Sequence, residues 1–181
     1  MTAKICAGLT ITKYHPGGIG MIALKLNNPK NFMSHLLLAD TFDHFLFIEG
    51  EIVTFNTFTI DGYIQKAFYD SDTPLPEYSF WKNIRELCFS MIRGKRTPLS
   101  FKFIFSLSPE NISRLIAQNH LDFQADTVQG LYLNIRFENG ELSCITGTSL
   151  KTFSMDKSLE KTWDSVVQKF FDQKGIVFTT T

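Results

Sequence analysis

The feature that most constrains the fold is a succession of predicted elements that occurs twice along the chain. Each copy begins with an apolar run before a proline-marked helix start, at Asn28-Pro29 and at Ser108-Pro109. An amphipathic helix, a strand pair around a turn, and a long helix with one of the two tryptophans follow. The offsets stay in register over whole elements: 80 from Pro29 to Pro109, 78 from Gly62 to Gly140, and 82 from Trp81 to Trp163. We therefore expect pseudo-repeats over about residues 21–97 and 98–175.

In the first unit, the helix after Pro29 is expected to end near Ala39-Asp40. Apolar patterning predicts strands over 42–48 and 51–55 around Glu49-Gly50. The alternation changes phase across Asn56-Thr57, which predicts a bulge or a strand break. Asp61-Gly62 predicts a tight turn between strands over 58–60 and 63–68, so we expect an antiparallel meander. A helix with an apolar face from Phe80 to Ile92 should end at Arg93-Gly94, with glycine in the usual C-terminal position.

In the second unit, period-two alternation predicts strands over 101–107 and 131–137. Asn139-Gly140 predicts a turn into a strand over 141–146. A final helix carries an apolar stripe from Leu159 to Phe171, and 176–178 is expected to add a short edge strand. Both Trp81 and Trp163 are expected to pack from their helices onto the sheet.

Strands with one dry face, together with helices of matching apolar stripes, predict a two-layer α+β domain. We expect a mainly antiparallel, twisted sheet with the helices on one face and a pseudo-twofold relation between two βαββ(β)α units. By analogy of topology alone, such a fold is like the TATA-binding protein or half of a sliding clamp. Fold does not determine function.

The first twenty residues have no partner in the repeat and lack the features of a secretory signal. Gly17-Gly18 shortly before Met21 suits a translated ribosome-binding site. We therefore expect residues 1–20 to be a mis-assigned start or leader, with a genuine flexible arm as the alternative. Residues 21–181 are expected to form one domain.

Composition limits the classes of function. Lys+Arg and Asp+Glu number 18 each, so the formal net charge is zero. Proteins that bind nucleic acid through phosphates usually carry a basic excess, so neutrality argues against that function. No apolar run reaches the length of a membrane span. Three cysteines without metal-type spacing suit a reducing compartment. Cys88 and Cys144 are expected to be small buried apolar residues.

Four strings are distinctive as a set: DTFDHFL at 40–46, TFTIDG at 57–62, RGKRTPL at 93–99, and GTSLK at 147–151 followed by DKSL at 156–159. They resemble a family of hypothetical proteins of unknown function from anaerobic Gram-positive bacteria, over about residues 21–175. The resemblance implies a cytoplasmic bacterial protein and supplies no activity, ligand or catalytic residue.

A basic cluster follows the helix at 80–92, where Arg93, Lys95 and Arg96 could bind a phosphate or an acidic partner. The alternative is that these cations complement the helix dipole and solvate the loop. The polar sheet face is expected to carry further binding residues: Thr59, Lys102, Asn134 and Arg136.

Two other clusters fit a structural role better than a chemical one. His35, Asp40, Asp43 and His44 match no established ligand spacing and are expected to serve as caps and turns, so neither a metal site nor a cofactor is predicted. The segment Thr146–Lys151 could hold an activated hydroxyl or an anion nest, but a twisted strand with a glycine bulge suits it better.

Three functions stay open. The favoured one is a non-enzymatic binding module that presents the sheet face and the 93–96 loop to an unknown partner, either another protein or a second copy. The alternative is an enzyme or small-molecule binder with a site between the halves, where Thr59 and Arg136 would converge. The third is nucleic-acid binding through the sheet, which requires a positive stripe.

Overall fold

The computed structural model describes residues 21–69 and 74–181, so the expected leader over 1–20 lies outside the described residues. In this part of the chain, seven strands form one sheet and four α-helices pack against it, which confirms the predicted α+β class. The strands are β1 (Ala23–Leu26), β2 (Leu46–Val53), β3 (Thr57–Asp61), β4 (Ser100–Ser106), β5 (Val128–Glu138), β6 (Glu141–Leu150) and β7 (Phe178–Thr180). The helices are α1 (Pro29–Leu37), α2 (Trp81–Ile92), α3 (Pro109–Gln118) and α4 (Ser158–Gln173), with 3-10 turns η1 (Lys66–Phe68) and η2 (Ala125–Thr127).

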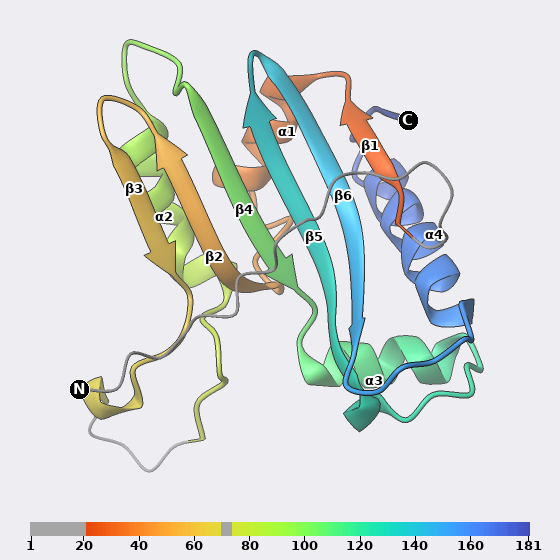
Figure 1. The fold of residues 1–181 in the computed structure, drawn as a ribbon. Coiled ribbons are helices and arrows are strands. Elements are labelled where there is room, and N and C mark those ends of the chain that lie inside the picture. The colour runs from red at the N-terminus through yellow and green to blue at the C-terminus, as the bar shows by residue number, and fades with distance from the viewer. Residues whose placement is uncertain (1–20, 70–73) are drawn as a thin grey trace.

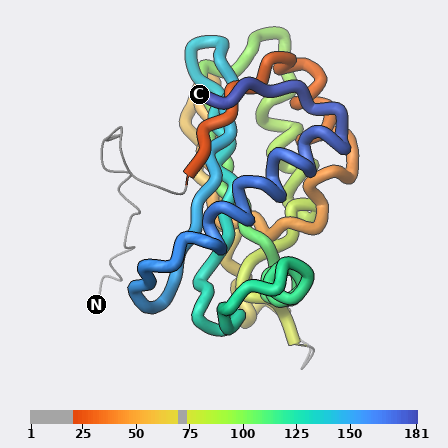
Figure 2. The backbone as a smooth tube through the Cα atoms, turned by 90° about the vertical axis from the view of Figure 1, so that its right-hand side faces the viewer, coloured from red at the N-terminus to blue at the C-terminus, as the bar shows by residue number. Residues whose placement is uncertain are grey.

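The sheet has the strand order β3-β2-β4-β5-β6-β1-β7, and all neighbouring strands are antiparallel. Seen edge-on, the helices lie on one side of it (Figure 2). Helices α1, α2 and α4 lie behind the sheet, and α3 lies across its lower end (Figure 1). The expected two-layer arrangement, with helices on one face, is therefore present in the described residues.

The succession β-α-β-β-α occurs twice along the chain, as the spacing of the prolines and tryptophans indicated. The leading strands nevertheless have different neighbours: β4 lies between β2 and β5, whereas β1 lies between β6 and β7. A twofold that exchanged the units would give these two strands equivalent neighbours. The strand order does not reproduce that relation, so the pseudo-twofold and the topological analogies stay unconfirmed.

Both proline-marked helix starts are confirmed. The Asn28 side chain accepts a hydrogen bond from the Asn31 backbone N–H at 3.1 Å, and Ser108 Oγ accepts one from Asn111 N–H at 3.4 Å. These side chains pair backbone donors that the first helical turn leaves without partners, and proline in the next position has no N–H to leave unpaired.

The strands of the first unit differ from the prediction. Strand β2 begins only at Leu46 and runs through Glu49-Gly50 without a turn, with an irregularity against β4 between Phe47 and Glu49. The chain reverses instead at residues 54–56, where the alternation lost its phase. Asp61-Gly62 is not a hairpin turn, and 63–68 forms an isolated bridge and η1 rather than a strand.

The second unit follows the prediction closely. Asn139 and Gly140 have φ values of 53° and 80°, as a tight turn between twisted strands requires, and they join β5 to β6. Strand β6 extends four residues beyond the predicted end at Thr146. An edge strand is present at the C-terminal end as β7, shifted two residues along the chain.

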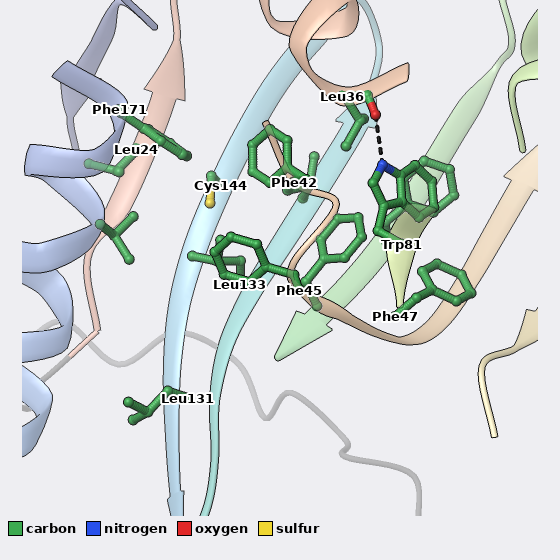
Figure 3. Close-up of a cluster of buried hydrophobic side chains, with 14 of the residues drawn as sticks. Leu24, Leu36, Phe42, Phe45, Phe47, Trp81, Leu131, Leu133, Cys144 and Phe171 are labelled. Carbon is green, nitrogen blue, oxygen red and sulfur yellow. Dashed lines mark hydrogen bonds between the residues drawn. The ribbon is translucent and has the colours of Figure 1, made fainter. Parts of the chain in front are cut away.

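The core between the layers is rich in aromatic side chains. Trp81 is fully buried, its indole Nε1–H donates to the Leu36 carbonyl at 2.7 Å, and its ring lies 5.4 Å from that of Phe47 (Figure 3). Trp163 is also buried and donates to the Tyr132 carbonyl at 3.0 Å. Phe47 lies on β2 and Tyr132 on β5, so both tryptophans pack from their helices onto the sheet, as predicted.

Candidate functional site

The open face of the sheet carries the predicted polar residues in one row. Strand pairing places side chains from all seven strands side by side across the sheet, in the order Thr59, Glu51, Lys102, Arg136, Ser143, Lys25 and Thr179. Asn134 lies one row away on β5 and donates from its amide to the Ile145 carbonyl at 3.3 Å. The sequence therefore predicted correctly that these side chains share a face.

The cations of this face are paired with carboxylates. Lys102 Nζ lies 3.5 Å from Glu49, Arg136 lies 2.6 Å from Glu138, and Lys25 lies 2.6 Å from Glu141. Since each base in the row has an acid beside it, the row forms no positive stripe. The side chains in these pairs are also exposed, so solvent screens each pair and each contributes little to stability.

Thr59 and Arg136 do not converge on a single point. They share the row, but β2 and β4 lie between their strands. Three interstrand steps separate them by about 14 Å, because neighbouring strands are about 4.8 Å apart. One small substrate cannot place the same reacting atom against both, so the enzyme hypothesis loses the pair on which it was based.

The second group of predicted residues surrounds a hollow at the end of the sheet. The hollow has a volume of about 490 Å³ and lies between the β2–β3 connection, the end of α2 and the loop that leads to β4. Its lining consists of Thr54, Phe55, Met91, Ile92, Arg93, Gly94, Lys95, Arg96, Thr97 and Leu99. In Figure 1 this is the corner where the loop after α2 lies beside the tip of β2 and β3.

Apolar side chains line the hollow and are unusually accessible. Phe55 is 84% exposed and Leu99 is 69% exposed, while Met91 and Ile92 are half-buried. The Phe55 ring contacts the Phe58 ring edge-on, with centroids 5.8 Å apart. Such side chains cost free energy in water, and covering them would recover it.

The cations at the rim differ from those of the sheet. Within residues 21–69 and 74–181, no carboxylate lies within 4.0 Å of Arg93, Lys95 or Arg96. Arg93 lies over the Phe89 ring, 5.8 Å from its centroid. The rim therefore combines exposed apolar surface with positive charge that has no acid beside it in the described part of the chain.

The sequence had singled out the cations of this candidate site but not Phe55 and Leu99. The signal for Phe55 was the loss of alternation at Asn56-Thr57, which we interpreted only as a bulge or strand break. A reversal at that point leaves the residue at its tip without a sheet face to cover it. Leu99 gave no such signal, because an apolar residue just before a strand is ordinarily buried.

Several residues of the remaining polar clusters have structural partners. His35 Nδ1 lies 2.9 Å from the Thr41 hydroxyl, and Arg85 donates to Asp43 at 2.8 Å and to the Ala39 carbonyl. No group of three or more His, Cys, Asp or Glu side chains suited to a metal occurs among the described residues. Thr146 lies within β6, where its buried hydroxyl donates to Asp164 at 2.5 Å.

The two described cysteines are buried, as predicted. Burial raises the pKa of the Cys88 thiol to about 12, and burial also raises the pKa of Cys144. Because the thiolate is the nucleophilic form, neither side chain suits nucleophilic catalysis.

A comparison with known proteins identifies the family of the chain. Residues 35–179 match the model of a family described as "Family of unknown function (DUF5721)". The chain belongs to this family. Neither a curated protein nor a solved structure matches it. In the described part of the DUF5721 chain, no helix has the length and apolar composition needed to cross a membrane.

Proposed function

We propose that this DUF5721 protein is a non-enzymatic binding module that holds an acidic protein partner at the hollow beside residues 93–96. The observation that supports this function is a combination of two features. The three rim cations have no carboxylate within 4.0 Å among the described residues, and the apolar lining beside them includes Phe55 and Leu99. Charge then selects the partner and sets the rate of association, while the apolar residues supply affinity.

The sheet face has a lesser part in this proposal than the sequence suggested. Lys102 and Arg136 already have acids beside them. A partner that used them would have to compete with those acids. The pairing of these cations also argues against nucleic acid on the sheet face, because binding through phosphates depends on cations that are free to replace counterions.

The family resemblance of the sequence also indicates the cellular compartment in which the partner would be found. It implies a bacterial cytoplasmic protein, and the three cysteines without metal-type spacing fit a reducing compartment. We expect the partner to be a cytoplasmic protein of the same cell.

Binding of a defined probe to matched variants tests the proposal. The probe is a fluorescent peptide with a leucine flanked by glutamates, and its binding is followed by anisotropy at low salt. Arg96→Glu should weaken binding about tenfold, because it reverses one charge at the rim. Arg136→Glu makes the same change on the sheet face and should leave the affinity within about twofold. Equal losses in the two variants would show that only net charge matters and would contradict the assignment to the hollow.

A further inference from the structure

Strand β3 is a sheet edge that lies next to the hollow. Among the described residues it pairs only with β2, through a regular register from Val53↔Thr57 to Glu49↔Asp61. Phe55, at the tip of the same hairpin, lines the hollow. The edge and the hollow therefore form one continuous surface, and a bound segment could contact both.

The hydrogen bonds at the two ends of β3 show which of its backbone groups face away from β2, the only strand it pairs with among the described residues. Thr54 N–H donates to the Asn56 carbonyl at 2.9 Å, and Gly62 N–H donates to the Ile48 carbonyl at 2.9 Å. Since alternate residues of an antiparallel strand face the same neighbour, Phe58 and Ile60 also bond to β2. The N–H and C=O groups of Thr57, Thr59 and Asp61 then point outward from the sheet.

This edge has few of the usual protections against pairing. Natural edge strands are commonly very short, or carry lysine, proline or a bulge. The opposite edge, β7, has only three residues. Strand β3 reads Thr-Phe-Thr-Ile-Asp and has five residues, no proline, no lysine and no bulge against β2. Its one charged residue, Asp61, lies at the end of the strand, so the rest of this edge is a template for an added strand.

Apolar surface continues behind the edge. Phe58 and Ile60, on the helix side of β3, are each only half-buried. Leu87, on the helix that lies behind β2 and β3, is 47% exposed (Figure 1). A segment added to β3 would alternate its side chains, so every second one would face this apolar side.

Charges near the two ends of β3 determine the direction in which an added segment would bind. Arg93, Lys95 and Arg96 lie at the Phe55 end, through the shared hollow. Asp61 lies at the other end of β3, directly opposite Glu49 on β2. An occupant with acids at one end and none at the other matches this arrangement, because like charges would repel each other beside Asp61.

We propose that the partner binds by adding an extended segment to the free edge of β3, with an apolar residue in the hollow and its acidic end against Arg93, Lys95 and Arg96. This inference rests on the proposed function and specifies how the acidic partner is held. Backbone hydrogen bonds to Thr57, Thr59 and Asp61 supply pairing that is independent of sequence, and the cations and the hollow supply selection.

The probe for this mode is a fluorescent peptide of alternating valine and threonine with glutamates at one end. A second peptide has the same sequence but carries N-methyl groups on alternate amides, which prevents strand pairing without changing charge. The wild-type protein should bind the unmodified peptide about tenfold more tightly than the N-methylated one, because the lost hydrogen bonds cannot be replaced.

A pair of variants tests the same step from the side of the protein. Thr59→Pro removes an N–H that points away from β2, a position where edge strands tolerate proline. It should weaken binding about tenfold, whereas Thr59→Val keeps the N–H and should bind like the wild type. Circular dichroism and thermal unfolding check that both variants are folded, and the N-methylated peptide gives a readout that needs no variant.

The outcomes separate the two proposals. If Arg96→Glu weakens binding but Thr59→Pro and N-methylation do not, the acidic partner stands and strand addition is wrong. If no acidic peptide binds, and the wild type forms a dimer that Thr59→Pro abolishes in light scattering, a second copy occupies the edge and the inference is overturned. If peptide binding and dimerisation are both absent, the proposed function fails as well.

Discussion

At the scale of residues, the structure changes the role of two glycines, one of which the sequence had assigned to a tight turn and the other to a helix end. Gly62 was expected in a tight turn, but the chain does not form a hairpin there, and an added Cβ would lie 1.8 Å from the Phe47 carbonyl oxygen. Gly94 follows the end of α2 as expected, yet it does so without the left-handed conformation common at that position, because the positive φ values among described glycines belong to Gly140 and Gly175. Sequence spacing locates such glycines but does not distinguish a turn from a close approach.

Gly62→Ala and Gly94→Ala form a matched pair that tests this difference. Gly62→Ala should lower the free energy of unfolding by about 1–3 kcal/mol or more, because backbone must move to admit the methyl group. Gly94→Ala should change it by less than about 0.5 kcal/mol, because its nearest neighbour is a carbonyl oxygen 3.8 Å away. Urea unfolding measures both, and equal effects would contradict the close approach at Gly62.

Asp164 makes stability depend on pH. Burial raises the pKa of its carboxyl group, which is opposed by the hydrogen bond from Thr146. The folded protein therefore holds this proton at pH values where the unfolded chain has lost it. Stability gained through Asp164 is largest below its unfolded pKa and is lost as the pH rises through the higher, folded pKa.

The variant Asp164→Asn, which cannot titrate, isolates this contribution. Relative to the variant, the wild type should gain free energy of unfolding as the pH is lowered from neutral toward the ordinary carboxyl range. Chemical unfolding at a series of pH values measures the difference. A difference that is constant with pH, or that moves in the opposite direction, would show that burial does not dominate at Asp164.

At the scale of elements, the pattern of α2 predicted more burial than the structure contains. The face from Phe80 to Ile92 was predicted to be apolar, but only Trp81 and Cys88 are buried within α2, and Leu87 is exposed. Periodicity shows which side of a helix is apolar. It does not show whether the sheet extends far enough to cover that side, because strand order depends on contacts distant in sequence.

Two leucine-to-alanine substitutions measure how far each helix is covered. Leu159→Ala in α4 removes a side chain that is 1% exposed and should cost about 2–5 kcal/mol of unfolding free energy. Leu87→Ala in α2 removes a half-exposed side chain and should cost less than about 1 kcal/mol. Similar losses at the two positions would show that α2 is covered after all.

At the scale of the whole molecule, the sequence predicted the class and the succession of elements because both follow from local patterns. It also placed Thr59, Lys102 and Arg136 on one face, because alternation along a strand fixes the face. It could not predict that the sheet would neutralise its own cations, since Lys102–Glu49 and Lys25–Glu141 join strands far apart in sequence. The distinction between paired sheet cations and the 93–96 rim therefore required the structure.

The central claim is that the hollow, rather than the open sheet face, contacts the natural partner. Photo-crosslinking in the native host tests it most directly, with a photoreactive residue in place of Leu99 in the hollow or of Ser143 on the sheet face. We predict an acidic protein crosslinked at position 99, lost when Arg96→Glu is added, and absent at position 143. Crosslinking at position 143 with none at position 99 would contradict the account.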